Sequence, residues 1–279
     1  MAPVARFRVG DVGLTRVSYF DVPLDPAVVQ LTADEVASFT WATPTWAAAD
    51  GQVLVGQALW VIEAGGRVIV VDPCGASDQF LRTGPEAFGH QEAVLAAMRD
   101  AGFEPERVDT VVLSHLDGIG MAAAVEPDGG WAPLFPNARI VMTATELEWL
   151  LSDAGWGAGL DALRALVARG VVDGVDDAHA LADAVSLRHT GGHSVGHAVV
   201  RVHSGGRTAI LLGHLALSPL QLATGECTNL HVDSARAAAA LDAILAEATV
   251  GDTLLIGPLW PFPGAVFATG GRIVAATPA

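Results

Sequence analysis

The chain has 279 residues, a net charge of −16 and no lysine, so its basic residues are 15 arginines. These arginines are scattered, whereas binding to nucleic-acid phosphates or to an anionic membrane surface requires clusters of basic side chains. The composition therefore argues against both kinds of partner. Apolar runs such as Val68–Val71 have the length of strands and fall far short of the ~20 residues of a membrane-spanning helix.

The N-terminal sequence, the cysteines and the chain length indicate the cellular compartment and whether the fold needs disulfides. The N-terminus lacks the basic, apolar and small-residue order of a signal peptide, and we expect a cytoplasmic protein. Cys74 and Cys227 are far apart in the chain and fit two free thiols in a reducing compartment. A chain of this length buries roughly three quarters of its unfolded surface, so it needs no disulfide for stability.

In chain order, short stretches rich in β-branched residues and bounded by turn residues predict strands at 52–60, 66–72, 108–115, 138–143, 185–189, 198–203, 208–213 and 253–257. Helical spacing predicts helices at 90–102, from 144, at 159–170 and at 233–248, the last with Asp233 as its N-cap. Residues 1–30 carry no helical period. Paired strands with helices between them favour two sheets with helices outside.

Four segments at predicted strand ends or loops stand out. They are SHLDGIG (114–120), TGGHSVGH (190–197), LLGHLALSPLQ (211–221) and IGPLWPFPG (256–264). The first three contain histidines, and functional sites are commonly built from such strand ends and loops. These segments are therefore the candidate places for a functional site.

This order of segments resembles the metallo-β-lactamase fold superfamily, and its lactonase-like branch in particular, over about residues 50–275. In that family a buried strand ends in His-x-His-x-Asp-His, and a Gly-His-rich loop, a Gly-Asp and a Gly-x-His follow. The resemblance implies an αββα sandwich with the site at one edge. It also implies a single domain over 1–279, in which residues 1–50 are an N-terminal extension packed on or capping it.

The resemblance implies metal ligands only where the matching residues can coordinate. His115 matches the first ligand, Asp117 stands in place of the second His, His193 matches the His of the second loop, and His214 replaces the bridging Asp. The positions exclusive to the second metal hold Ile119, Gly120 and Leu259, which cannot coordinate through a side chain.

The four remaining positions suggest a mononuclear site with three His and one Asp, because imidazole and carboxylate suit Zn, Fe or Mn. The alternative stays open that the protein is metal-free. His115 and His193 would then hold loops by hydrogen bonds, and His214 would be a general base or a packed core residue.

Other residues are assigned by the same comparison. Asp72 matches an Asp that, in the family, supports the metal ligands without binding the metal itself. It also fits an ordinary turn residue at the end of a strand. Ile119, Leu259, Trp260 and Phe262 predict an apolar pocket for a hydrophobic small molecule, unless they simply pack the core. The remaining histidines, His197 and His231 among them, belong to no ligand position and are expected to be structural or surface residues.

Three functions remain open. The first is a cyclase, dehydratase or isomerase that modifies an apolar small metabolite, for example in secondary metabolism, with His214 and Asp117 as acid and base. This is the reading we favour from sequence, because the usual water-activating pair of metals has lost its ligands. The alternatives are a mononuclear-metal hydrolase of lactones, esters or thioesters, and a non-catalytic binding protein. A homodimer is also left open.

Overall fold

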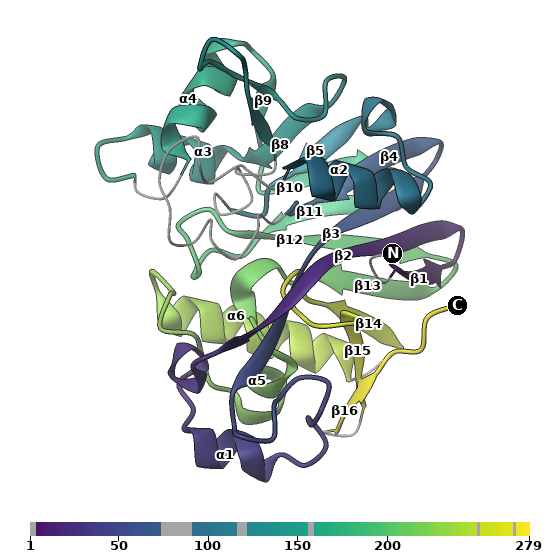
Figure 1. The fold of residues 1–279 in the computed structure, drawn as a ribbon, viewed down its shortest axis with the longest axis vertical. Coiled ribbons are helices and arrows are strands. Elements are labelled where there is room, and N and C mark those ends of the chain that lie inside the picture. The colour runs from purple at the N-terminus through teal and green to yellow at the C-terminus, as the bar shows by residue number, and fades with distance from the viewer. Residues whose placement is uncertain (1–3, 74–90, 116–121, 156–158, 250–251, 270–271) are drawn as a thin grey trace.

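The computed structural model describes residues 4–73, 91–115, 122–155, 159–249, 252–269 and 272–279. Its main feature is a pair of seven-stranded sheets, one formed mainly by the N-terminal half of the chain and the other by the C-terminal half. Helices cover the outer faces, as Figure 1 shows. The predicted αββα sandwich is therefore confirmed.

The first sheet has the strand order β1-β2-β3-β4-β5-β8-β9. Its strands are Val4–Val9, Val12–Leu24, Val53–Ala64, Arg67–Val71, Thr110–Val112, Arg139–Thr143 and Val172–Val175. Strands β1 to β4 pair antiparallel, and β4, β5, β8 and β9 pair parallel. A short ribbon, β6 (Ala123–Val125) and β7 (Trp131–Pro133), lies outside this sheet.

The second sheet runs from β10 to β16 in chain order. Its strands are Ala178–Ala182, Val185–His189, Ala198–Ser204, Arg207–Leu211, Thr253–Ile256, Ala265–Thr269 and Arg272–Ala275. Only the β13–β14 pair is parallel within it. Every strand predicted from sequence has a counterpart in one of the two sheets, although the strand expected at 108–115 is limited to Thr110–Val112.

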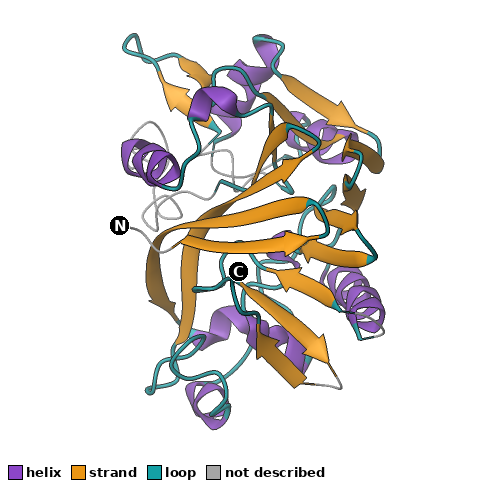
Figure 2. Cartoon of the chain, turned by 90° about the vertical axis from the view of Figure 1, so that its right-hand side faces the viewer, coloured by secondary structure: helices purple, strands orange, loops and turns teal. Residues whose placement is uncertain are grey.

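Apolar side chains fill the space between the layers. Between the two sheets lie residues from both, among them Ile62, Ile69, Leu187 and Val200, all fully buried. Helices α2 (Gln91–Asp100), α3 (Ala144–Leu151) and α4 (Leu160–Ala168) pack on the first sheet. Helices α5 (Pro219–Thr224) and α6 (Ser234–Ala248) pack on the second, together with α1 (Ala33–Ser38). Figure 2 shows the strands between the helices from a second direction.

The N-terminal residues form strands that sequence analysis did not predict. Strand β2 pairs with β3 along most of its length and carries a fully buried Arg16. Arg16 Nη2 donates to the carbonyls of Gly56 at 3.2 Å and Trp260 at 2.7 Å. The bond to Gly56 stays within the sheet, on β3, and the bond to Trp260 ties β2 to the loop that follows β14. Because a buried guanidinium needs acceptors, the backbone of that loop is held in place.

None of the described helices combines the length and the apolarity needed to cross a bilayer.

Candidate metal site

Three histidines from three separate strand ends meet in the interior. His115 follows β5, His193 lies in the loop between β11 and β12, and His214 lies in a single 3-10 turn after β13, Gly213–Leu215. Their exposed fractions are only 3%, 6% and 2%. Each offers a ring nitrogen, and these nitrogens all lie within 4.8 Å of one another. His115 and His193 are 78 positions apart in the chain, and His193 and His214 are 21 apart. The fold brings all three together at the edge of the sandwich.

The rings are close enough to share one small cation. His115 Nε2 lies 2.9 Å from His214 Nδ1, and the His193 ring centroid is 4.7 Å from that of His115 and 5.1 Å from that of His214. Two facing ring nitrogens need a proton or a cation between them, since two lone pairs would repel. Neutral imidazole is also the commonest protein ligand for transition metals. The trio therefore has the donor chemistry that a divalent metal ion requires.

The orientation of His115 is fixed by its neighbours. Ser114 Oγ lies 2.8 Å from His115 Nδ1, and Ser114 N donates to Asp72 Oδ1 at 2.7 Å. Asp72 is itself buried at the end of β4, with a left-handed backbone at φ +42°. A non-glycine residue in this conformation is uncommon and is held there by its surroundings. The Asp72 carboxylate thus fixes the backbone that leads into His115.

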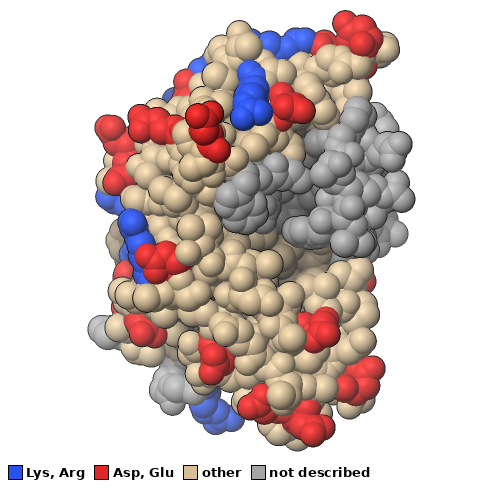
Figure 3. All heavy atoms as spheres, turned by 90° about the vertical axis from the view of Figure 1, so that its left-hand side faces the viewer, with Lys and Arg blue, Asp and Glu red and all other residues tan. Residues whose placement is uncertain are grey.

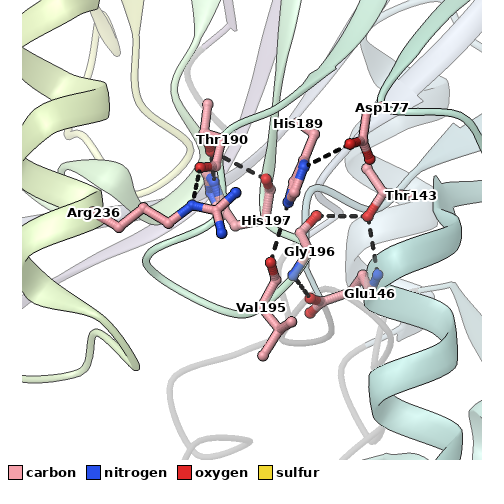
Figure 4. A network of polar contacts seen from close by, with 9 residues as sticks. All are labelled: Thr143, Glu146, Asp177, His189, Thr190, Val195, Gly196, His197 and Arg236. Carbon is pink, nitrogen blue, oxygen red and sulfur yellow. Dashed lines mark hydrogen bonds and ion pairs between the residues drawn. The ribbon is translucent and has the colours of Figure 1, made fainter.

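The loop that carries His193 is held from one side by the start of α3 (Figure 4). Glu146 Oε2 accepts a hydrogen bond from Gly196 N at 2.7 Å, which Figure 4 shows, and another from Ser194 Oγ at 2.8 Å. Thr143 Oγ1, which caps α3, donates to Gly196 O at 2.6 Å. Glu146 is only 1% exposed. Sequence analysis missed both residues, since they belong to a helix start and not to a histidine motif.

The same loop is held from the other side by α6 and the residues before it. Val232 N donates to His193 O at 3.1 Å, and Asp233 N donates to Gly192 O at 2.9 Å. Arg236 Nε donates to Thr190 O at 2.9 Å, as Figure 4 shows. His193 is therefore positioned by two helices that belong to opposite outer layers.

His197 supports the site without belonging to the trio. It is fully buried, and its Nδ1 lies 2.8 Å from Thr190 Oγ1. Burial, followed by the neighbouring His115 and His214, lowers the pKa of His197 well below its usual value. This ring is therefore neutral near pH 7 and acts as a packed hydrogen-bonding group.

Gly213 allows the close approach of these side chains, which gives a testable prediction. Its φ is +54°, and a Cβ there would lie 2.5 Å from His197 Nε2 and 2.7 Å from Ser114 Oγ. We expect Gly213→Ala to lower the free energy of unfolding by about 2–4 kcal/mol, from left-handed strain plus overpacking. Chemical denaturation measures this loss.

The matched control is Gly225→Ala. Gly225 has φ +74°, and a Cβ there would meet nothing within 4 Å. Its substitution should cost only the backbone strain, about 1–2 kcal/mol. Equal losses for the two variants would contradict the close packing of His197 and Ser114 around Gly213.

The other residues expected at the site fall into three groups. Asp117, Ile119 and Gly120 lie outside the described residues. Leu259 and Trp260 belong to the buried cluster beneath α5 and α6, and Trp260 Nε1 donates to Ala216 O at 3.0 Å. Phe262 is 40% exposed.

His231 lies beside the trio although no motif marked it. Its Nδ1 is 3.2 Å from His193 Nδ1, and the residue is partly buried in the segment before α6. Burial, and then the neighbouring His214, lower the pKa of His231 to about 4. Its partner is 38 positions earlier in the chain, so only the fold shows the pairing.

Comparisons with known proteins agree with this architecture. No family model and no curated protein sequence matches the chain. Among solved structures, the hydrolase AbOPH of the β-lactamase superfamily superposes with a TM-score of 0.79 at 18% identity, covering 100% of this chain and 98% of that chain. The dizinc quorum-quenching lactonase AidC gives 0.76 at 16% identity, again covering 100% and 98%.

A probable metal-dependent hydrolase from Staphylococcus aureus also gives a TM-score of 0.76, at 14% identity, covering 98% of this chain and 99% of that chain. At these identities the likeness is one of fold. The chain has the metallo-β-lactamase fold, with lactonases among its structural neighbours.

Proposed function

We propose that the protein is a metal-dependent hydrolase of neutral lactones or esters that works with a single divalent ion. The observation that carries this proposal is the convergence of His115, His193 and His214, three buried imidazoles with ring nitrogens within 4.8 Å. A structural role alone would not require three mutually facing rings in the interior, because buried polar groups are normally satisfied in simpler ways.

The structural neighbours favour hydrolysis over the cyclase, dehydratase or isomerase reading. AidC and an N-acyl homoserine lactone hydrolase are both lactonases with the product N-hexanoyl-L-homoserine bound. At 16% and 15% identity, these neighbours support a reaction class and not a particular substrate. Hydrolysis is therefore proposed ahead of the cyclase, dehydratase or isomerase reaction that the sequence alone favoured.

The trio would hold the ion, with Asp117 as the proposed fourth ligand. Such an ion supplies Lewis-acid polarisation of the scissile carbonyl and makes water more acidic. Without the ion, one proton lies between His115 Nε2 and His214 Nδ1, 2.9 Å apart. The same contact makes His214 a ligand in this proposal, so His214 and Asp117, the acid and base expected from sequence, would both serve as ligands.

The substrate class follows from charge and polarity. The net charge of −16 disfavours anionic substrates. Figure 3 shows acidic side chains mainly around the margin of one face, with few charges on the described surface between them. Leu259 and Phe262 remain the proposed apolar contacts of the acyl group. A neutral ester or lactone with an apolar acyl or aromatic part fits these features.

The proposal is tested by turnover of aliphatic and aromatic lactones, esters and thioesters. We expect at least one neutral lactone or ester to react with kcat/KM of about 10⁴ M⁻¹ s⁻¹ or above, the lower end of ordinary enzymes. Dialysis against a chelator should abolish the activity, and added Zn, Fe or Mn should restore it.

Folded, metal-loaded protein that turns over none of these compounds would contradict the proposal. If such protein still bound aromatic small molecules, a tailoring enzyme or a binding protein would account for the chain better. Undiminished turnover after complete removal of metal would contradict the role of the ion while leaving hydrolysis in place.

A further inference from the structure

We propose that His231 is a positioning residue that holds His193 in the one tautomer able to bind a metal ion, an inference that rests on the proposed metal site. His231 belongs to none of the ligand positions of the trio. Its role would be to accept a hydrogen bond from His193, so that the opposite nitrogen of the His193 ring presents its lone pair to the ion.

The contact itself requires a shared proton. His193 Nδ1 and His231 Nδ1 lie 3.2 Å apart, and the two rings are nearly perpendicular, at 83°. A neutral imidazole carries one N–H and one lone pair, so one of these nitrogens must donate to the other. The two choices have opposite consequences for the site.

If His193 Nδ1 donates, its Nε2 has a lone pair available to a metal ion. If His231 Nδ1 donates instead, the His193 proton lies on Nε2, and that nitrogen cannot coordinate. Metal-binding histidines nearly always donate their second N–H to a fixed acceptor, usually a carboxylate or a carbonyl. Here the ring of His231 occupies the place of that acceptor.

The backbone holds His231 in register with His193. The next residue, Val232, donates its N–H to His193 O at 3.1 Å, and Asp233 N donates to Gly192 O at 2.9 Å. Asp233 also caps α6 through its bond to Arg236 N at 3.0 Å. His231 is therefore attached to the rigid start of a helix, as an orienting residue requires.

The same arrangement determines which ring nitrogen of His231 carries the proton. If its Nδ1 accepts, the proton lies on Nε2, which is buried and makes no hydrogen bond within the described part of the chain. That N–H is then available to a water molecule or to a ligand.

The test compares three variants that differ in where they place an acceptor. His231→Asn puts an amide oxygen close to the position of Nδ1, His231→Gln puts one further out, and His231→Leu removes it. The tautomer of His193 is read in metal-free protein from long-range ¹H–¹⁵N correlations. The ring signals of His193 are assigned as those that are absent from the spectrum of His193→Ala. Zinc affinity is read by competition with a chromophoric chelator.

We expect Nδ1–H on His193 in the wild type and in His231→Asn, and its loss in His231→Leu and His231→Gln. Zinc affinity should fall by about 10- to 100-fold in the last two variants and be restored in His231→Asn. Thermal unfolding of each variant checks that the fold is intact. An unchanged tautomer and an unchanged zinc affinity in His231→Leu would overturn the proposal.

The two proposals can fail separately. The tautomer is measured without metal, and neither measurement depends on turnover. A wild-type protein that hydrolyses nothing would contradict the proposed function, while the His193 tautomer in His231→Leu would still decide the role of His231.

Discussion

Replacing Glu146 by alanine is expected to lower the free energy of unfolding by about 3–5 kcal/mol, because two buried donors lose their acceptor. These donors are Ser194 Oγ and Gly196 N, both bonded to Glu146 Oε2. A buried donor that is left without an acceptor costs about 1–3 kcal/mol. The loop that carries His193 should loosen as well, so zinc affinity should fall together with stability.

Urea denaturation of Glu146→Ala and Glu148→Ala gives the comparison. Glu148 lies on the same helix and is exposed, so its substitution should change stability by no more than about 0.5 kcal/mol. Glu146→Gln keeps an acceptor of similar shape and should fall between the two. Similar losses for Glu146→Ala and Glu148→Ala would mean that Glu146 does not hold the His193 loop.

The second large effect is expected at the trio. His115→Ala and His193→Ala should each lose the bound metal and lower kcat/KM by about 10³-fold or more, since the ion supplies several kcal/mol of transition-state stabilisation. The fold should persist, because the packed sheets and helices do not depend on these side chains.

His203→Ala is the control for this prediction. His203 lies on β12 and is exposed, and its side chain lies 3.0 Å, at Nδ1, from Thr208 Oγ1. Its substitution should leave metal content and turnover unchanged. Turnover that survives in both His115→Ala and His193→Ala would place the reaction elsewhere in the molecule.

Local sequence patterns were sufficient to predict much of the fold. The strand predicted at 66–72 is β4, which ends at Val71, and the helix after Asp233 has the expected N-cap, with Asp233 accepting from Arg236 N. His115, His193 and His214 were selected by motif, and the fold brings all three together. These features depend on a few neighbouring residues, which a sequence displays directly.

Features that depend on distant partners could not be predicted in this way. Strand β2 is buried even at Thr15, Arg16 and Ser18, so the alternation of polar and apolar residues gives no signal there. Glu146 looks like an ordinary exposed helix residue until Gly196, 50 positions later, is packed against it. His231 gains its meaning only from contact with His193.

The most direct test of the metal site is the metal content of wild-type protein purified without chelator and without added metal. We expect about one Zn, Fe or Mn ion per chain by elemental mass spectrometry, and its loss in His193→Ala. Well-folded protein that contains no metal, and takes up none when these ions are supplied, would mean that His115, His193 and His214 do not form a metal site.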